Sequence, residues 1–432
     1  MFSTRLFTTH SQKQWSVLSA NTVAFAGNFA VWTLFSILGI QIKQDLGLTD
    51  TQFGVLIATP ILTGSLSRLP LGILTDIFGG RRVFTILMLC IVPAIYSINL
   101  ATAYWHYLVI GLFVGLAGGS FAVGIAYTSA WFDKDRQGTA MGIFGAGNAG
   151  AAITNLAAPL LIVAYGWESV PTIYAISMLV IIVLFWIFTF EDPAHSDKSV
   201  ARKRLCLKTQ LAPLKEIRVW RFGLYYYFVF GGFVALALWL PKYYIGQFDV
   251  DLKTASFLTL LFTLPSGLIR ALGGWFSDKY GARTINWWVF WICLVCLFFL
   301  SYPPTTMIIH GIEEDIAVGI ELGMWPFTTL VFIVGMAMGF GKASVYKIIN
   351  DYYPTQMGSV GGMVGVLGGL GGFTLPIMFG VVSDFTGVRS SCFMLLYAVL
   401  AACMILMYYA IKHEEQKQPT KNISNEQAAI TN

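Results

Sequence analysis

Long apolar runs constrain this sequence more than any other feature. We distinguish twelve of them, at about 15–42, 52–77, 83–102, 107–132, 138–165, 170–190, 220–247, 254–279, 284–302, 323–350, 358–384 and 389–411. A helix needs about 20 predominantly apolar residues to cross the bilayer core. Of the 432 residues, 56% are hydrophobic and only 11% are charged, whereas a soluble domain carries about 25% charge. The sequence therefore predicts an all-α membrane protein with twelve transmembrane helices, and a soluble protein with a large core is disfavoured.

A polar motif at the end of the second run recurs at the end of the eighth. Five positions match, and the two members of each pair lie 202 residues apart. The pairs are Arg68 and Arg270, Gly72 and Gly274, Asp76 and Asp278, Gly79 and Gly281, and Arg81 and Arg283. Glycines of the fourth and fifth runs recur in the tenth and eleventh at a spacing of 220 residues. Such a repeat indicates two pseudo-symmetric six-helix halves, as in transporters that bind their substrate at the midplane.

The repeat divides the chain into four parts. We expect an N-terminal six-helix bundle at 1–191, a basic cytoplasmic linker at 192–218, a C-terminal six-helix bundle at 219–411 and a disordered cytoplasmic tail at 412–432. Cations gather on one side of the runs: Arg81, Arg82, Lys134, Arg136, the linker, Lys279 and Arg283. Because basic loops stay in the cytoplasm, we expect both termini to be cytoplasmic and the acidic loop before Trp325 to lie outside.

Each copy of the motif places one arginine deep inside an apolar run. Arg68 and Arg270 each precede the Asp of the motif by eight residues, which is about 12 Å of helix. If that Asp lies at the membrane surface, the arginine lies near the middle of an apolar core about 30 Å thick. A cation at that depth is costly and indicates a functional site. The alternative is that each arginine binds carbonyl groups or a local carboxylate, although no Asp or Glu is expected near the midplane.

The fifth and eleventh runs are unusually rich in glycine. Small residues let membrane helices approach closely and slide, so these runs suit either a moving interface or static tight packing. The glycines that we assign to gating and helix packing are Gly145, Gly147, Gly150, Gly365, Gly368 and Gly369. Asn148 is a polar amide within the fifth run, and it could bind a substrate or only a neighbouring helix.

These features resemble those of a protein superfamily and, more specifically, those of one family within it. The segments Gly72 to Arg82 and Gly274 to Arg283 look like the loop motif of the major facilitator superfamily, with Ile77 where a basic residue is usual and Lys279 conforming. The arginines of the second and eighth runs, together with the glycine-rich fifth and eleventh runs, resemble the nitrate/nitrite porter family over nearly the whole chain. The resemblance implies the major facilitator fold, a monomer in the inner (plasma) membrane with no cofactor, and secondary active transport of nitrate and/or nitrite by alternating access.

The resemblance also implies roles for individual residues. It makes Arg68 and Arg270 a paired clamp on the anion, and it places Asn148 and Tyr226 near the substrate, with Tyr225 and Tyr227 as neighbouring alternatives in the alignment. A planar, permanently charged guanidinium with forked donors suits a small planar anion. The loop motifs, with Gly72, Asp76, Arg81, Gly274, Asp278 and Arg283, would control the conformational change.

Anion uptake against an inside-negative potential needs an energy source, because one charge across 100 mV costs about 2.3 kcal/mol. All five histidines fall at the ends of runs or in loops, and no acidic residue is expected in mid-span. That pattern is compatible with nitrate/nitrite antiport. Lys342, however, lies well inside the tenth run, where relatives often have Asn, and burial beside two arginines would ease the loss of its proton. We name Lys342 and Lys347 as candidates for coupling, although Lys347 could simply extend to the interface, and we favour nitrate import by proton symport.

Other functions are less consistent with the sequence. A transporter for an organic or phosphorylated anion would need more polar side chains in mid-span, and the aromatic residues Phe29, Trp32, Phe35 and Phe144 suggest a narrow pocket. A membrane receptor would need a soluble output domain, for which the linker and tail are too short. No enzyme constellation and no metal site rises above chance, and a net charge of +5 gives no reason to expect a nucleic-acid partner.

Overall fold

The computed structural model describes residues 9–132, 140, 143–191, 215–310, 312, 314–353 and 357–430. Within these ranges, eleven helical segments are long and apolar enough to cross a membrane. A bent pair of helices, which turns by 49° at its break, provides a twelfth span. The prediction of an all-α membrane protein with twelve spans is confirmed.

The first half contains six spans, several of which are broken into shorter helices. Its elements are α2 (His10–Trp32), α3 (Phe35–Leu46), α4 (Asp50–Leu66), α5 (Arg68–Phe78), α6 (Gly80–Ser97), η1 (Ile98–Leu100), α7 (Tyr104–Gly115), η2 (Leu116–Gly119), α8 (Ser120–Trp131), η3 (Ala146–Ala149), α10 (Gly150–Tyr165) and α11 (Ser169–Phe188). The first span combines α2 with α3, and the second combines α4 with α5.

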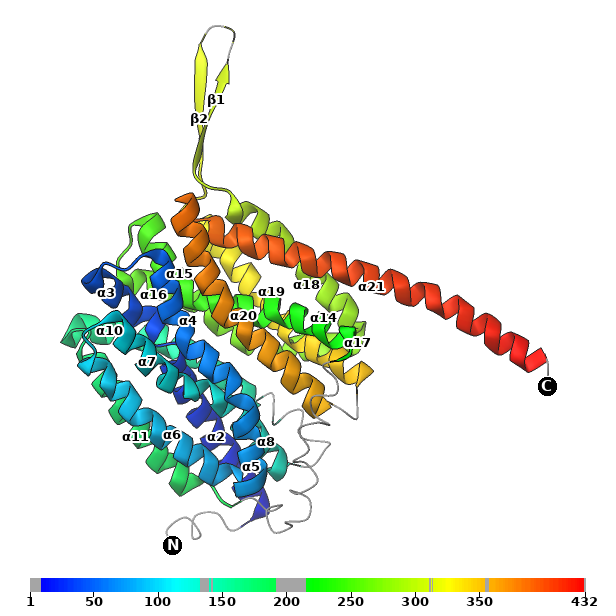
Figure 1. The fold of residues 1–432 in the computed structure, drawn as a ribbon, viewed down its shortest axis with the longest axis horizontal. Helices are drawn as coiled ribbons and strands as arrows, with labels where there is room; N and C mark the ends of the chain where they lie inside the picture. Colours follow the sequence, from blue (N-terminus) through cyan, green and yellow to red (C-terminus); the bar gives the residue numbers. More distant parts are fainter. Residues whose placement is uncertain are drawn as a thin grey trace.

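The second half repeats this arrangement and adds a β-hairpin. Its elements are α14 (Ile217–Tyr226), the π-helix η6 (Tyr227–Gly232), α15 (Phe233–Phe248), α16 (Leu252–Leu268), α17 (Arg270–Tyr280), α18 (Ala282–Ser301), β1 (Thr305–His310), β2 (Asp315–Ile320), α19 (Met324–Tyr352), α20 (Met357–Thr386) and α21 (Ser391–Ile430). Strands β1 and β2 pair antiparallel, with Thr305 opposite Ile320. They project from one end of the helical bundle, which we call the hairpin end (Figure 1).

The sequence repeat has a structural counterpart at the helix breaks. Arg68 is the first residue of α5, after α4 ends at Leu66, and Arg270 is the first residue of α17, after α16 ends at Leu268. Each of these helices then ends at a glycine with positive φ, +83° at Gly79 and +88° at Gly281. Because only glycine adopts such a backbone readily, the repeated glycines are required by the turns that they form.

Two helix pairs make the main contacts between the halves. Helix α4 packs along α20, and α10 packs along α16. Glycines bring α4 and α20 together, because a methyl group added at Gly54 would lie 2.3 Å from the carbonyl oxygen of Pro376. At Gly369 it would lie 2.2 Å from the hydroxyl oxygen of Ser65. Glycines thus let α4 and α20 approach closely at both of these points.

The outer surface of the bundle is apolar, as the lipid-facing surface of a membrane protein must be. Large hydrophobic side chains on outer helices are exposed, among them Trp105, Val163, Ile176, Trp288 and Phe299. A soluble monomer seldom exposes so much contiguous apolar surface. The burial pattern therefore agrees with a multi-pass membrane protein.

The structure differs from expectation at the C-terminal tail. Helix α21 continues to Ile430, and it extends well beyond the bundle (Figure 1), whereas we expected residues 412–432 to be disordered. The tail is rich in Glu, Gln and Lys, which favour helix, and it continues a helix that is already nucleated. The predicted linker at 192–218 lies mostly outside the described residues, because 192–214 are not among them.

Candidate functional site

Arg68 is held where the two halves meet. Its guanidinium carbon lies 5.3 Å from the ring centroid of Phe121 on α8, 5.9 Å from that of Trp32 on α2 and 5.4 Å from that of Phe230 on η6. The first two rings belong to the first half and the third to the second. Aromatic faces within about 6 Å attract a cation, so rings from both halves hold this side chain.

The hydrogen-bonding capacity of Arg68 is largely unused. One long bond, of 3.4 Å, runs from its Nη1 to the carbonyl oxygen of Gly365 on α20. Its Nε is buried and has no hydrogen-bond partner in the described part of the chain. A buried donor without a partner is costly, and such a group is satisfied when a ligand accepts its hydrogen bond.

Arg270 and Arg68 both lie close to one tyrosine, Tyr346. The guanidinium carbon of Arg270 lies 5.8 Å from the ring centroid of Tyr346 on α19. The Tyr346 hydroxyl donates to the carbonyl oxygen of Gly361, at 3.1 Å. A methyl group added at Gly365 would lie 3.1 Å from that hydroxyl oxygen and 3.9 Å from Nη1 of Arg68. The absence of a side chain at Gly365 therefore leaves room for Tyr346 and Arg68 to approach each other.

Among the three consecutive tyrosines of the seventh span, Tyr226 is the one that joins this cluster. It is 2% exposed, stacks on Phe230 with centroids 5.1 Å apart, and meets Tyr346 edge to face at 5.0 Å. Tyr225 packs on Phe290 of α18 instead, and the Tyr227 hydroxyl shares a hydrogen bond of 2.6 Å with Thr374. The π-helix begins directly after Tyr226, and such helices are frequent at functional sites.

Asn148 is hydrogen-bonded within its own helix rather than to the arginine site. It lies in η3 and is 8% exposed. Its Nδ2 donates to the carbonyl oxygen of Gly145, at 2.9 Å. No hydrogen bond joins it to Arg68 or Arg270 among the residues that the structure describes, so its role in binding stays a prediction.

Lys342 of the second half is a third cation, and its side chain is buried. It is 3% exposed, its Nζ donates to the Ser266 hydroxyl at 3.1 Å, and it lies 3.5 Å from the ring centroid of Phe233. Tyr346 is the fourth residue after Lys342, so both side chains project from one face of α19. In the ranges covered by the structure, no ion pair joins Arg68, Arg270 or Lys342 to a carboxylate. This uncompensated positive charge suits an anion.

Lys347 belongs to a different environment. Its Nζ lies 3.0 Å from Asp278 and 3.4 Å from Asp351, and its side chain is 34% exposed. The pair with Asp278 links α19 to the last turns of α17, and the pair with Asp351 lies within α19. The structure thus separates the two lysines that the sequence suggested for coupling.

The loop motifs are only partly described. Arg81 donates from Nη2 to the carbonyl oxygen of Trp186, at 2.6 Å, and Arg283 lies 5.0 Å from the ring centroid of Tyr352. Nothing lies within 4 Å of a methyl group added at Gly72 or Gly274, so packing does not require glycine at either position. The side chain of Asp76 lies outside the described residues.

The six glycines assigned to gating and packing fall into separate groups. Methyl groups added at Gly147 and Gly150 would meet α2, at 2.4 Å from Phe25 and 2.1 Å from the carbonyl oxygen of Ala26. These two therefore pack within the first half, and Gly368 packs against Tyr226 within the second. Gly369 lies across the interface against Ser65, Gly365 lies at the arginine site, and Gly145 faces open space.

Sequence reasoning missed Tyr346 and the rings of Phe121 and Phe230. The spacing of Lys342 and Tyr346 on one helix face was the available signal for the tyrosine. Of the aromatic residues predicted to narrow the pocket, Trp32 contacts Arg68, whereas Phe29 and Phe144 pack on Phe25 inside the first half.

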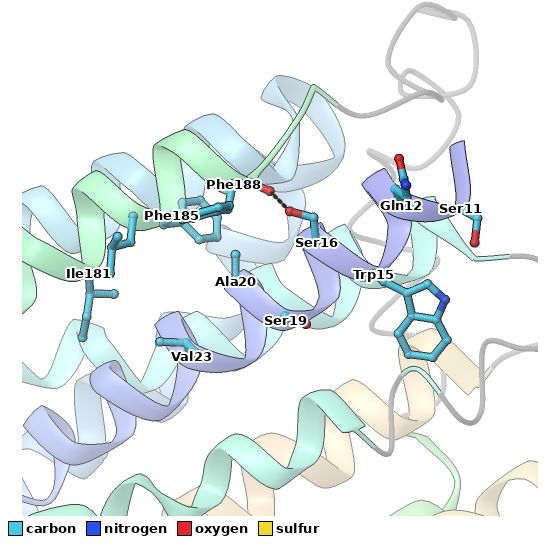
Figure 2. Close-up of a pocket in the computed structure, with 11 residues that line it drawn as sticks. Ser11, Gln12, Trp15, Ser16, Ser19, Ala20, Val23, Ile181, Phe185 and Phe188 are labelled. Atoms are coloured by element: carbon cyan, nitrogen blue, oxygen red, sulfur yellow. Dashed lines mark hydrogen bonds between the residues drawn. The ribbon is translucent and has the colours of Figure 1, made fainter. Parts of the chain in front are cut away.

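A groove elsewhere on the bundle is separate from this site. It has a volume of about 610 Å³ and lies between α2 and α11 (Figure 2). Its lining residues are Ser11, Gln12, Trp15, Ser16, Ser19, Ala20, Val23, Ile181, Leu184, Phe185 and Phe188. Because none of them is Lys or Arg, the groove has no cation with which to bind an anion.

Two pseudo-symmetric six-span halves with cations at their interface define a secondary transporter of the membrane. A family model described as Major Facilitator Superfamily matches residues 20–319 and 316–431. The chain belongs to that superfamily, and its relatives place it in the nitrate/nitrite porter family.

Two relatives illustrate this membership, and one solved structure illustrates the fold. The chain is 41% identical to "Probable nitrate/nitrite antiporter NarK1" of Thermus thermophilus, over 94% of each chain. It is 30% identical to "Nitrite extrusion protein" of Bacillus subtilis (strain 168), over 94% of this chain and 97% of the relative. A solved bacterial homolog of the human lysosomal transporter Spinster, in an inward-facing and occupied conformation, superposes with a TM-score of 0.70 at 16% identity, over 92% of this chain and 96% of that one.

Proposed function

We propose that this protein transports nitrate and nitrite across the membrane by alternating access. The observation that carries the proposal is the meeting of Arg68 and Arg270 around Tyr346, without a carboxylate paired to either arginine among the described residues. Nitrate and nitrite are small, planar and monovalent, and a guanidinium offers them forked donors in one plane. The names of the relatives support the same substrates.

In this proposal the anion bridges the two halves. Arg68 contributes from the first half, with its unused Nε and Nη donors, and Arg270 contributes from the second. Tyr226 and Phe230 form one wall of the site, and Asn148 contributes an amide in another state of the cycle. Because one anion leaves two arginines with a net charge near +1, binding remains reversible, as transport requires.

For the energy source we propose proton symport with Lys342 as the proton carrier, which makes the protein a nitrate importer. Support comes from its burial without a carboxylate partner in the described ranges, because a lone buried ammonium can lose its proton at tolerable cost. The charged and titratable groups of the arginine site that face this part of α19 are Arg270 of α17, Tyr346 of α19 itself, Tyr226 of α14 and Arg68 of α5. We propose no such role for Lys347, because its ammonium pairs with Asp278 and Asp351.

Nitrate/nitrite exchange is the second candidate. The name of the Thermus thermophilus relative favours it, and exchange needs no proton carrier at all. An organic or phosphorylated anion is a third, weaker candidate, since the rings around Arg68 leave little room for a larger ligand.

We further propose the arrangement of the protein in the cell. The distribution of cations supports an orientation in the plasma membrane with both termini cytoplasmic and the hairpin end outside. We propose a monomer from the resemblance to the porter family. The halves would be 1–191 and 219–411, with 192–218 as a cytoplasmic linker.

A counterflow experiment tests these proposals. Purified protein in nitrite-loaded vesicles should take up external nitrate, and the Arg68→Gln and Arg270→Gln variants should not. Arg82→Gln is the matched control, because Arg82 is exposed and pairs with Glu191 at 3.2 Å. Undiminished nitrate flux after both site arginines are neutralised would refute the proposal, and so would thermal stabilisation of the protein by glycerol phosphate but not by nitrate or nitrite.

The same vesicles separate the two coupling modes. An inward proton gradient should stimulate uptake by the natural protein and fail to stimulate Lys342→Ala, while Lys347→Ala behaves as the natural protein. If the gradient has no effect on the natural protein, exchange is the better description. If Lys342→Ala retains the full response, Lys342 has no part in coupling.

A further inference from the structure

A second cluster of charges joins the two halves at the hairpin end. Asp50, the first residue of α4, forms ion pairs with Lys43 of its own half and with Lys242 of α15 in the other half. The Lys242 pair has an N–O distance of 2.5 Å. The hydroxyl of Ser383, near the end of α20, donates to the same carboxylate at 2.8 Å. One carboxylate of the first half is thus held by two groups of the second.

A carboxylate of the second half, that of Asp384, binds the first backbone amides of α4. Asp384 accepts hydrogen bonds from the backbone N–H of Asp50 at 3.0 Å and of Thr51 at 2.7 Å, and from the Thr51 hydroxyl at 2.5 Å. A helix leaves its first four N–H groups without partners inside the helix. Thr49 supplies the acceptors for the next two, at Gln52 and Phe53.

The start of α4 therefore depends on the other half for its first two hydrogen bonds. The negative charge of Asp384 also lies at the positive end of the helix macrodipole. Helix α4 is complete only while the two halves are together at this end.

The helices are in backbone contact at the same place. A methyl group added at Gly380 would lie 2.3 Å from the carbonyl oxygen of Asp50 and 2.6 Å from Cα of Thr51. The Nζ of Lys242 lies 4.3 Å from the ring centroid of Trp239 and 5.4 Å from that of Phe53. No room remains for a solute to pass between α4 and α20 at this point, so the hairpin end is closed between these two helices.

We propose that Asp50, Lys242, Ser383 and Asp384 form an ionic latch that closes the transporter at the hairpin end. Alternating access requires this end to open in the other state, and every interaction across the latch must then break. The chemistry suits a reversible closure. The side chain of Asp384 is exposed and that of Asp50 is 21% exposed, so water can solvate the separated charges and the freed amides of α4.

The latch differs in position and in partners from the arginine site. Its charges balance once the neighbouring Lys43 is counted, with Lys43 and Lys242 against Asp50 and Asp384, whereas the arginine site has no compensating acid in the described ranges. The latch would thus set the proportion of the two conformations before any substrate binds, and the arginine site would select the substrate.

Labelling of a buried cysteine tests the latch without any substrate. Ile61 lies on α4 between the latch and Arg68, is fully buried, and packs against Gly372 of α20. We expect Ile61→Cys to react slowly with a membrane-impermeant maleimide applied at the hairpin end, which is the external face in the proposed orientation. Adding Asp384→Asn should raise the labelling rate by about tenfold, the change in an equilibrium constant that the loss of one charge-assisted hydrogen bond produces.

The controls decide between a latch and a general loosening. Asp315→Asn removes a carboxylate at the same end that pairs only with His310 in the described structure, and it should leave labelling unchanged. Gly380→Ala serves as a second test in case Asp384→Asn does not fold. Its added methyl group separates the helices by steric contact rather than by charge, and it should also raise the labelling rate.

Unchanged labelling in folded Asp384→Asn and Gly380→Ala proteins would overturn the latch, and so would an increase confined to the opposite face. Because nitrate is absent throughout, the outcome is independent of the proposed substrate.

Discussion

Replacing Arg68 by lysine separates the charge of the site from its geometry. The guanidinium has five N–H donors, of which one makes a long bond of 3.4 Å to Gly365, while the buried Nε has no partner in the described residues. Its donors are thus available to a bound anion. Lysine keeps the positive charge but offers a single ammonium in place of the planar fork.

The expected cost follows from the number of hydrogen bonds lost. Arg68→Lys removes one of two parallel charge-assisted bonds, each worth about 1.5–3 kcal/mol, which corresponds to a roughly 10- to 100-fold weaker nitrate affinity. Arg270→Lys should have a similar but smaller effect, because one ring rather than three lies against that guanidinium.

The assay is the nitrate dependence of counterflow in vesicles, supported by nitrate titration of the melting temperature. Arg82→Lys is the matched control, since it changes an exposed arginine that is paired at the surface. An affinity for Arg68→Lys within about threefold of the natural value would refute the reasoning, because charge alone would then account for binding.

Three further predictions follow from the packing of other parts of the structure. Gly369→Val places a side chain 2.2 Å from the Ser65 hydroxyl. It should destabilise the protein by about 1–3 kcal/mol and abolish counterflow. Gly362→Val is the control, because nothing lies within 4 Å of a methyl group added there, and it should change neither the melting temperature nor counterflow. Tyr346→Phe removes a hydrogen bond to a carbonyl of α20, and in denaturant titrations it should lower the free energy of unfolding by about 0.5–1.5 kcal/mol. A variant as stable as the natural protein would show that the bond contributes nothing. Replacing β1 and β2 by a short Gly/Ser loop should leave the melting temperature and counterflow unchanged, because all twelve strand residues are exposed, and a lower melting temperature would reveal a contact with the bundle.

The spans and the duplication could be predicted from the sequence. Each depends on a local rule, since an apolar run of about 20 residues must cross the bilayer and a motif repeated at one spacing must fold in the same way twice. The turns at Gly79 and Gly281 illustrate this, because both have the positive φ that the repeated glycines permit. The polar composition of the tail was less informative, since the same residues also favour helix.

Contacts between distant segments could not be predicted, because no local pattern encodes which faces of two helices meet. The sequence contains Tyr346 and Phe121, but only the folded chain brings them to Arg270 and Arg68. The latch is a clearer case, since Asp50 and Asp384 are 334 residues apart. The sequence by itself determined a duplicated twelve-helix protein with two costly arginines, because hydrophobicity and helix length act along the chain. Only the tertiary structure decided which rings and amides surround those charges, because pairing across the two halves depends on how whole helices pack.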